Sequence, residues 1–174
     1  LFDQAARGAR ETLKPRRQLL AWAAALAEVG RSVSHEDFHK HSSYILAHSD
    51  MPGFSRREQD RLALLALAQS GGLEKLRPHV DDDVEWLAVQ ALRISTILHR
   101  RRDALEVPTP ALFVSTGSLR LETTNQWAVR FPLSHQSLVA EAKAWSDAGI
   151  FRCFAYRTIG DRLSRPSGQF DAAT

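Results

Sequence analysis

A short stretch of the chain holds four of its seven histidines, with Lys40 among them: His35, His39, His41 and His48. Imidazole and ammonium groups donate hydrogen bonds to phosphate oxygens, and a bound anion favours the charged form of an imidazole. Such a patch is typical of a surface that binds phosphate groups. The alternative is that one or two of these imidazoles only satisfy buried carbonyl groups. The sequence leaves both interpretations open.

The spacing of these histidines disfavours a metal site. On a helix His41 and His48 share one face, whereas His39 and Lys40 point elsewhere. The two carboxylates that precede the cluster sit on other faces again, so no complete set of ligands comes together. We therefore expect no metal ligands in this region.

Arg93 is the second candidate. It lies among apolar residues on a segment that is apolar on more than one side of a helix. Its guanidinium should therefore be shielded from solvent, where it either pairs with a carboxylate or lines a cleft. Arg100 follows one heptad later on the same side and would extend such a lining, although a place at a helix end explains it equally well.

The composition limits the classes of protein that are possible. The chain has 174 residues, of which 44% are hydrophobic and 25% charged, so it can bury a core, and it has no long apolar span. Its single cysteine, Cys153, excludes an internal disulfide, which fits a reducing compartment, and we expect the cytoplasm and no membrane contact. Because the chain starts at Leu1 and its only methionine is Met51, we expect it to be part of a longer protein.

The charge is unevenly placed and no catalytic motif accompanies it. The net charge is +3, with arginines in runs at 16–17, 56–57 and 100–102, which favours an anionic partner. The sequence has no glycine-rich phosphate loop, no nucleophile elbow and no cysteine paired with a base, so we expect no catalytic residue in it. Tryptophans fall in apolar patterns rather than between basic residues, which disfavours nucleic acid.

The first hundred residues carry the periodicity of helices. We expect Gly30 to end the first helix in a left-handed conformation, and Ser55 with Glu58 to form a capping box before the third. In the second helix Phe38, Ser42 and Ile45 should share one side. The predicted helices cover about 15–29, 36–48, 56–68 and 84–98.

The pattern changes after Pro108 and Pro110. A short apolar run predicts a strand at 111–115, and alternating apolar residues predict strands at 119–121, 127–131 and 150–156, with a helix through Leu138 and Trp145 between the last two. The fold class is therefore mainly α, with a helical domain at 1–105 and a small α+β domain at 108–160. We expect the polar tail at 161–174 to be disordered.

The segment FHKHSSYILAHSDMPGFSRREQDRLALL, residues 38–65, resembles the exopolyphosphatase and guanosine pentaphosphate phosphohydrolase family. WAAALAEVGRSVSHEDFHKH upstream and ALRISTILHRRR downstream support the resemblance, which is strong over 19–102 and loose over 108–156. It implies an HD-like helical domain up to about residue 105. It also implies that the magnesium site and the catalytic glutamate lie in N-terminal catalytic domains, which are absent from this sequence.

The resemblance carries over some residues and not others. The positions that match are candidate liners of a polyphosphate channel: His35, His39, Lys40, His41, Arg93 and Arg100. Relatives are expected to have histidine where this chain has Ala27, and a His-Arg pair where it has Gln69 and Ser70. Losing these imidazoles makes metal-dependent hydrolysis by the helical domain improbable.

These observations predict the C-terminal polyphosphate-binding and assembly region of an exopolyphosphatase, inactive by itself and homodimeric in the whole enzyme. Mg²⁺ is expected in the absent N-terminal half. The alternatives are the same region of a guanosine pentaphosphate phosphohydrolase, an HD-type metal phosphohydrolase, or a helical scaffold that binds RNA or another subunit.

Overall fold

The computed structural model describes residues 14–80, 82–99, 111–115, 118–150 and 153–160. It confirms a mainly α fold with a small sheet. The described residues form two compact units, 14–96 and those from 97 onward. The predicted domain boundary at 105–108 and the predicted tail at 161–174 lie outside the described residues. The likeness of the helical unit to an HD domain stays a prediction.

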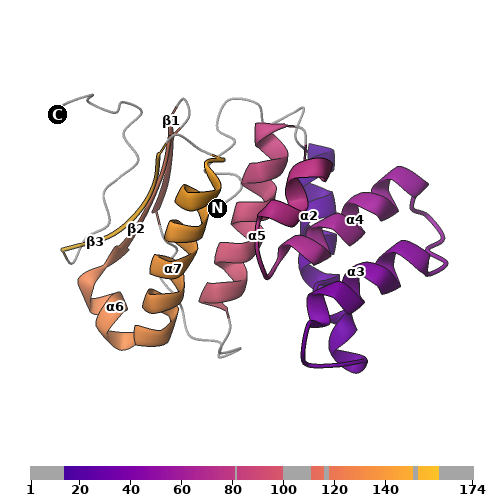
Figure 1. Ribbon diagram of the computed structural model, residues 1–174, viewed down its shortest axis with the longest axis horizontal. Coiled ribbons are helices and arrows are strands. Elements are labelled where there is room, and N and C mark those ends of the chain that lie inside the picture. Colours follow the sequence, from indigo (N-terminus) through magenta and orange to yellow (C-terminus); the bar gives the residue numbers. More distant parts are fainter. Residues whose placement is uncertain (1–13, 81, 100–110, 116–117, 151–152, 161–174) are drawn as a thin grey trace. The chain divides into compact units, whose positions relative to one another are not determined.

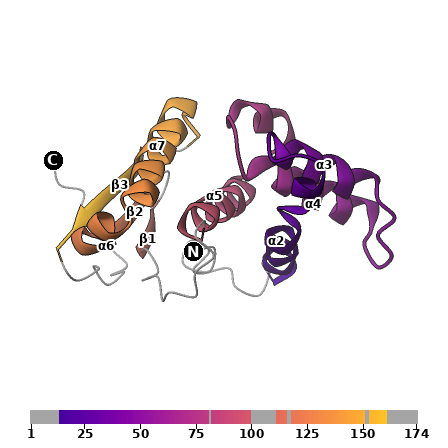
Figure 2. The ribbon, with the colours of Figure 1, turned by 90° about the horizontal axis from the view of Figure 1, so that it is seen from below.

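The helical unit contains the four predicted helices and two short 3-10 turns. Helices α3 and α4 pack side by side in both views, and α2 packs against α4 (Figures 1 and 2). The elements are α2 (Lys14–Leu26), η1 (Val29–Ser32), α3 (Phe38–His48), α4 (Arg56–Ala68), η2 (Glu74–His79) and α5 (Asp83–Leu98).

The start of α4 confirms the predicted capping box. The amide of Glu58 donates to Ser55 Oγ at 3.3 Å, and the amide of Ser55 donates to Glu58 Oε2 at 2.8 Å. These two bonds satisfy amides that would otherwise lack partners at the helix start. The pair thereby fixes where the chain turns from the loop into α4.

Gly30 does not play the predicted role of a left-handed helix stop, because it is not among the residues with positive φ. It is needed for close packing instead. A Cβ at Gly30 would lie 2.2 Å from the carbonyl oxygen of Phe38 and 2.3 Å from the amide nitrogen of Ser42, which leaves room only for hydrogen. The segment after α2 therefore lies directly against the main chain of α3.

The buried side of α3 also differs from the prediction. Its buried residues are His39, Ser42 and Leu46, whereas Phe38 and Ile45 are only half-buried. Ser42 can be fully buried because its hydroxyl accepts from the amide of Gly30 at 2.9 Å and donates to the carbonyl of Ala27 at 2.7 Å. The observed buried side is thus turned by less than one residue from the predicted side, with Ser42 common to both, and it includes His39.

The second unit is a three-stranded sheet with a helix on one face. Strand order is β1-β2-β3; β1 and β2 are antiparallel, and β2 and β3 are parallel, with Leu121 opposite Tyr156. Helix α7 lies along the sheet and buries Leu138 and Trp145 (Figures 1 and 2). The elements are β1 (Ala111–Ser115), β2 (Ser118–Thr124), α6 (Asn125–Arg130), α7 (Pro132–Ala148) and β3 (Cys153–Ile159).

The strand predicted at 127–131 is wrong, since most of that segment belongs to helix α6. Thr124 caps this helix by accepting from the amide of Trp127 at 3.1 Å. Trp127 and Phe131 are one helical turn apart and their ring centroids lie 5.4 Å from each other, while Val129 is exposed. Over so few residues this i, i+4 pair produced the same alternation as a strand.

No helix among the described residues is both long and apolar enough to span a bilayer.

Candidate functional site

Three cationic side chains of the helical unit meet at the turn that follows α4. His39 comes from α3, Lys75 from η2 and Arg93 from α5. The charges of Lys75 and Arg93 lower the pKa of His39, and the charge of Arg93 also lowers that of Lys75. Gly71, which lies in the turn between α4 and η2, is their common neighbour. We call these four residues the cation cluster.

Arg93 is the structural anchor of the cation cluster. It is 7% exposed, and its Nη1 donates to the carbonyl of Ala68 at 2.9 Å and to that of Gly71 at 3.0 Å. These carbonyls belong to the C-terminal end of α4, where a cation is favourable and the backbone needs donors. Sequence reasoning considered a carboxylate partner or a cleft for Arg93, and it did not anticipate these main-chain partners.

His39 is 6% exposed, with its ring edge-on to that of Phe38. Burial lowers the pKa of its imidazole, and the nearby charge of Lys75 lowers it further. Asp37 acts in the opposite direction. A buried imidazole next to cations is therefore mostly neutral at pH 7, and it can still donate or accept a hydrogen bond.

Lys75 is the member of the cluster that sequence reasoning missed. Its Nζ donates to the carbonyl of Ser70 at 2.7 Å, and burial, followed by the charges of Arg93 and Lys40, lowers its pKa to about 8. The sequence signal for Lys75 lies in its neighbours Glu74 and Arg77, which have opposite charges at i, i+3 spacing and pair at 2.8 Å. Such a pair on one side of a turn directs the residue between them to another side.

Gly71 has a φ of +80°, a conformation that favours glycine. A Cβ at this position would lie 3.0 Å from Lys75 Nζ and 3.4 Å from His39 Nε2. Both side-chain nitrogens therefore lie close to one point beside the main chain of Gly71. A side chain at this position would be crowded by them, so glycine allows both donors to approach the backbone.

The other predicted site residues are placed differently. Lys40 is exposed and bound to Asp37 at 2.6 Å, but its charge still reaches both His39 and Lys75. His41 lies on another side of α3, with its Cβ near Gly30, and His35 is exposed in the preceding loop. Arg100 lies outside the described residues. The structure thus brings together His39, Lys40 and Arg93 from the six predicted residues.

A family model described as "Ppx/GppA phosphatase, domain III" matches residues 1–142, which is most of the chain. The chain belongs to the Ppx/GppA phosphatase family. This confirms the family suggested by residues 38–65. The match extends over the described helical unit and into α7 of the sheet unit.

Curated relatives in the Ppx/GppA family resemble most of this chain at similar levels of identity. A guanosine-5'-triphosphate,3'-diphosphate pyrophosphatase of Pseudoalteromonas translucida is 31% identical over 134 residues, which cover 75% of this chain and 27% of the relative. A protein of the same name from Photobacterium profundum is 31% identical over 147 residues, with 79% and 28% covered. The chain therefore spans a little over a quarter of the length of these relatives.

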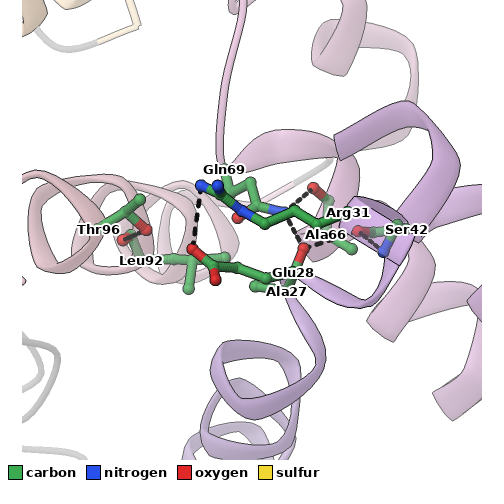
Figure 3. Close-up of polar contacts among 9 residues, drawn as sticks. Ala27, Glu28, Arg31, Ser42, Ala66, Gln69, Leu92 and Thr96 are labelled. Atoms are coloured by element: carbon green, nitrogen blue, oxygen red, sulfur yellow. Dashed lines mark hydrogen bonds and ion pairs between the residues drawn. The ribbon is translucent and has the colours of Figure 1, made fainter. Parts of the chain in front are cut away.

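The two positions at which this Ppx/GppA chain lacks an expected histidine touch each other. Figure 3 shows the side chain of Gln69 donating to the carbonyl of Ala27, and it donates to the carbonyl of Ala66 at 3.0 Å as well. Ser42 reaches the same carbonyl of Ala27 from α3. Neutral amide and hydroxyl groups thus occupy this point and link α2, α3 and α4.

Among the residues that the structure describes, no group of three or more histidine, cysteine or acidic residues is placed to hold a metal ion. Ala27 offers no ligand atom, and the Nε2 of Gln69 is a donor that is already engaged by two carbonyls. Gln69 Oε1 has no hydrogen-bond partner among the described residues, but one amide oxygen is not a set of metal ligands, so we assign no metal-dependent step to these residues. The absence of a metal ion from this chain stays a prediction.

Proposed function

We propose that this region of a Ppx/GppA phosphatase holds the phosphate chain of the substrate, which we take to be inorganic polyphosphate, while hydrolysis occurs in domains outside this sequence. The cation cluster supports the proposal. Two cations, Lys75 and Arg93, and the imidazole of His39 lie at the turn at Gly71, and the carboxylate that acts on His39 and Lys75, Asp37, is bound to Lys40. An anionic ligand would supply the negative charge that this set of donors lacks.

The energetic cost of the cluster favours a ligand role over a structural one. Burial and mutual repulsion lower the pKa of both His39 and Lys75. Among the described residues no carboxylate lies within ion-pair distance of Lys75 Nζ. The fold gains one hydrogen bond from this half-buried ammonium, to the carbonyl of Ser70, whereas an anion in contact with it would add a charge-assisted hydrogen bond and compensate the charge. Each phosphate of a polyphosphate supplies about one negative charge, as in a nucleic-acid backbone.

The second candidate substrate is guanosine pentaphosphate. The names of the relatives favour it, since they are called guanosine-5'-triphosphate,3'-diphosphate pyrophosphatases. Both substrates present a run of phosphates, so the cation cluster suits either. They differ in the guanosine, which needs an additional pocket for a base.

The remaining parts of the proposal concern the whole enzyme. We propose that Mg²⁺ and the general base are supplied by N-terminal catalytic domains, and that the whole enzyme is a cytoplasmic homodimer. In such an arrangement, binding far from the cleavage point raises the concentration of substrate near the active site.

Titration of the chain with polyphosphate, guanosine pentaphosphate and RNA at two salt concentrations tests the proposal. We expect polyphosphate to bind with a steep loss at higher salt. Lys75→Met should lower the affinity roughly tenfold, because Lys75 donates directly. Lys143→Met is the matched control, since Lys143 is an exposed lysine bound to Asp147 in the sheet unit. Equal losses in the two variants would contradict the assignment of the site.

A second measurement tests the expected absence of catalysis. The purified chain should release no phosphate from polyphosphate in the presence of Mg²⁺ or Mn²⁺. Phosphate release that Gln69→Ala abolishes and Lys75→Met spares would instead support the HD-type metal phosphohydrolase.

A further inference from the structure

The geometry at Gly71 is more specific than a general affinity for anions. Lys75 Nζ and His39 Nε2 lie 3.0 and 3.4 Å from the position that a Cβ of Gly71 would take. Arg93 fixes the turn by binding the carbonyls of Ala68 and Gly71 at 2.9 and 3.0 Å. The two donor nitrogens thus lie near one point, and the hydrogen bonds from Arg93 stabilise the main chain next to them.

We infer that His39, Lys75 and the turn at Gly71 form a receptor for a single phosphate group with two negative charges, and that this group binds together with a proton. The chemistry is shared by free orthophosphate and by the end of a phosphate chain. The inference rests on the proposed function and narrows it, because it assigns the cluster to chain ends rather than to the middle of a polymer.

The size of the receptor favours one phosphate group. His39 is buried and Lys75 is half-buried, so little of either donor is presented to a ligand that passes along the surface. Lys40, the exposed cation nearby, is already bound to Asp37. Two oxygens of one phosphorus can reach both donors at Gly71, and a neighbouring phosphate would have to contact the outer residues.

The charge state favours a terminal phosphate. A phosphate inside a chain carries one negative charge, whereas a terminal group or orthophosphate gains a second one above a pKa of about 6. Two cations whose charged forms are disfavoured in the unoccupied protein gain most from a ligand that supplies two charges. A monoanion would compensate only one of them.

Proton uptake follows from the lowered pKa values. Burial lowers the pKa of His39, and burial together with Arg93 and Lys40 lowers that of Lys75 to about 8, against a smaller opposite effect of Asp37. A bound anion raises both values, so the complex holds more protons than its separated parts. The affinity should therefore fall as the pH rises above about 8, by up to roughly tenfold per pH unit.

The first experiment compares three ligands by calorimetry in two buffers with different heats of ionisation. We expect orthophosphate and linear tripolyphosphate to bind with net proton uptake at pH 8.5. Trimetaphosphate is a ring without ends, and we expect it to bind at least about tenfold more weakly than the linear form. Because the two forms also differ in net charge, the decisive result is that Lys75→Met removes the difference between them.

A pair of glycine variants tests the geometry. Gly71→Ala and Gly53→Ala both place a side chain at positive φ, but only Gly71 has Lys75 and His39 near its Cβ; at Gly53 nothing lies within 4 Å. Both variants should lose similar stability from backbone strain. Only Gly71→Ala should lose orthophosphate binding, and equal retention of binding in both would overturn the inference.

Nuclear magnetic resonance of the histidines provides a direct readout. Saturating orthophosphate should raise the pKa of His39 and shift its ring resonances. The ring resonances of His48 should not move, since His48 is on the same helix but exposed, with Nδ1 near the carbonyl of Tyr44. A competition experiment distinguishes free orthophosphate from the end of a phosphate chain as the ligand. If one orthophosphate displaces one polyphosphate chain end, the receptor binds chain ends.

The outcomes distinguish this inference from the proposed function. If polyphosphate binds through Lys75 without proton uptake, and trimetaphosphate binds as well as tripolyphosphate, the terminal receptor is wrong and the proposed function stands. If no phosphate compound binds at low salt, both are wrong.

Discussion

The two units differ in whether a buried charged group has an oppositely charged partner. In the sheet unit, Glu122 is fully buried. Its Oε1 forms an ion pair with Arg120 Nε at 3.0 Å and accepts a hydrogen bond from Arg157 Nε at 2.7 Å, while its Oε2 has no hydrogen-bond partner among the described residues. In the helical unit, His39 and Lys75 lie near another cation, Arg93, and burial weakens their charged forms. One unit matches a buried anion with cations, and the other gathers cations around a glycine.

This difference indicates which charges stabilise the fold and which are available to a ligand. A buried carboxylate between two guanidinium groups is internally compensated, so its removal should harm folding. A half-buried ammonium beside other cations opposes folding, so its removal should spare stability and harm binding. Substitutions in the two units therefore test this difference.

Glu122→Ala should have the largest effect. It leaves Arg120 and Arg157 without their shared carboxylate and should lower the free energy of unfolding by about 3 kcal/mol, at the lower end for a broken buried pair because both arginines reach solvent. Urea denaturation followed by circular dichroism measures this loss. Lys143→Ala, which breaks only the exposed pair with Asp147, should cost less than about 1 kcal/mol. Similar losses in both would mean that burial of Glu122 contributes little.

Arg93→Met should follow, with a loss of about 2 kcal/mol. The carbonyls of Ala68 and Gly71 lose a charged donor at the end of α4. Hydrogen exchange should increase at the turn around Gly71 before it increases in the rest of α4. Because Arg93 supports the turn, its loss should also weaken phosphate binding, and unchanged exchange together with weaker binding would show direct contact instead.

Local sequence signals predicted most of the helical unit. The capping box of Ser55 and Glu58 marked the start of α4, a short apolar run identified β1, and alternating apolar residues identified β2 and β3. The errors occurred where tertiary contacts decide the outcome. Gly30 is needed for contact with α3 rather than for a left-handed turn. Trp127 and Phe131 repeat in a way that suits a short helix and a strand equally.

The candidate site was predictable only in part, because its members come from different elements. Residue type and spacing selected His39, Lys40 and Arg93, since histidines cluster in α3 and an arginine interrupts an apolar helix. Lys75 has no periodic pattern of its own. The charges of Glu74 and Arg77 direct it to another side of the turn, but only the fold brings it to Gly71. His35 and His41 do not join the cluster. His35 lies in the loop before α3, and His41 faces another side of that helix, because neighbouring residues on a helix face different directions.

Lys75→Met should change stability little, and it should stabilise the chain, whereas Glu122→Ala and Arg93→Met destabilise it. The pKa of Lys75 is about 8 in the folded chain and ordinarily 10.5, so the folded state binds fewer protons between these values. The contribution of Lys75 to the free energy of unfolding therefore rises with pH between about 8 and 10.5. Below pH 8 Lys75 destabilises the fold by its full amount. We expect the melting temperature of Lys75→Met to equal or exceed that of the parent at pH 7. A clear decrease would show that the bond from Nζ to the carbonyl of Ser70 outweighs the penalty.

Asp82→Asn should produce the smallest effect, confined to acid pH. Arg16 donates to both carboxylate oxygens of Asp82, at 2.8 and 2.6 Å, and this contact lowers the pKa of Asp82 from 3.8 to about 2. The contribution is therefore present above about pH 4 and is lost as the pH falls through 2. Because the pair is partly exposed, it should amount to about 0.5 kcal/mol. Asparagine can still cap α5 by accepting from the amide of Glu85, so the substitution isolates the charge.

Thermal melts at two pH values measure this contribution. The melting temperatures of the parent and Asp82→Asn should differ at pH 7 and lie closer together at pH 2.5. Asp60→Asn is the control, because Asp60 pairs with Arg56 at an exposed position, and it should show no such convergence. Parallel melting curves for parent and Asp82→Asn across this range would show that Arg16 contributes through geometry rather than charge.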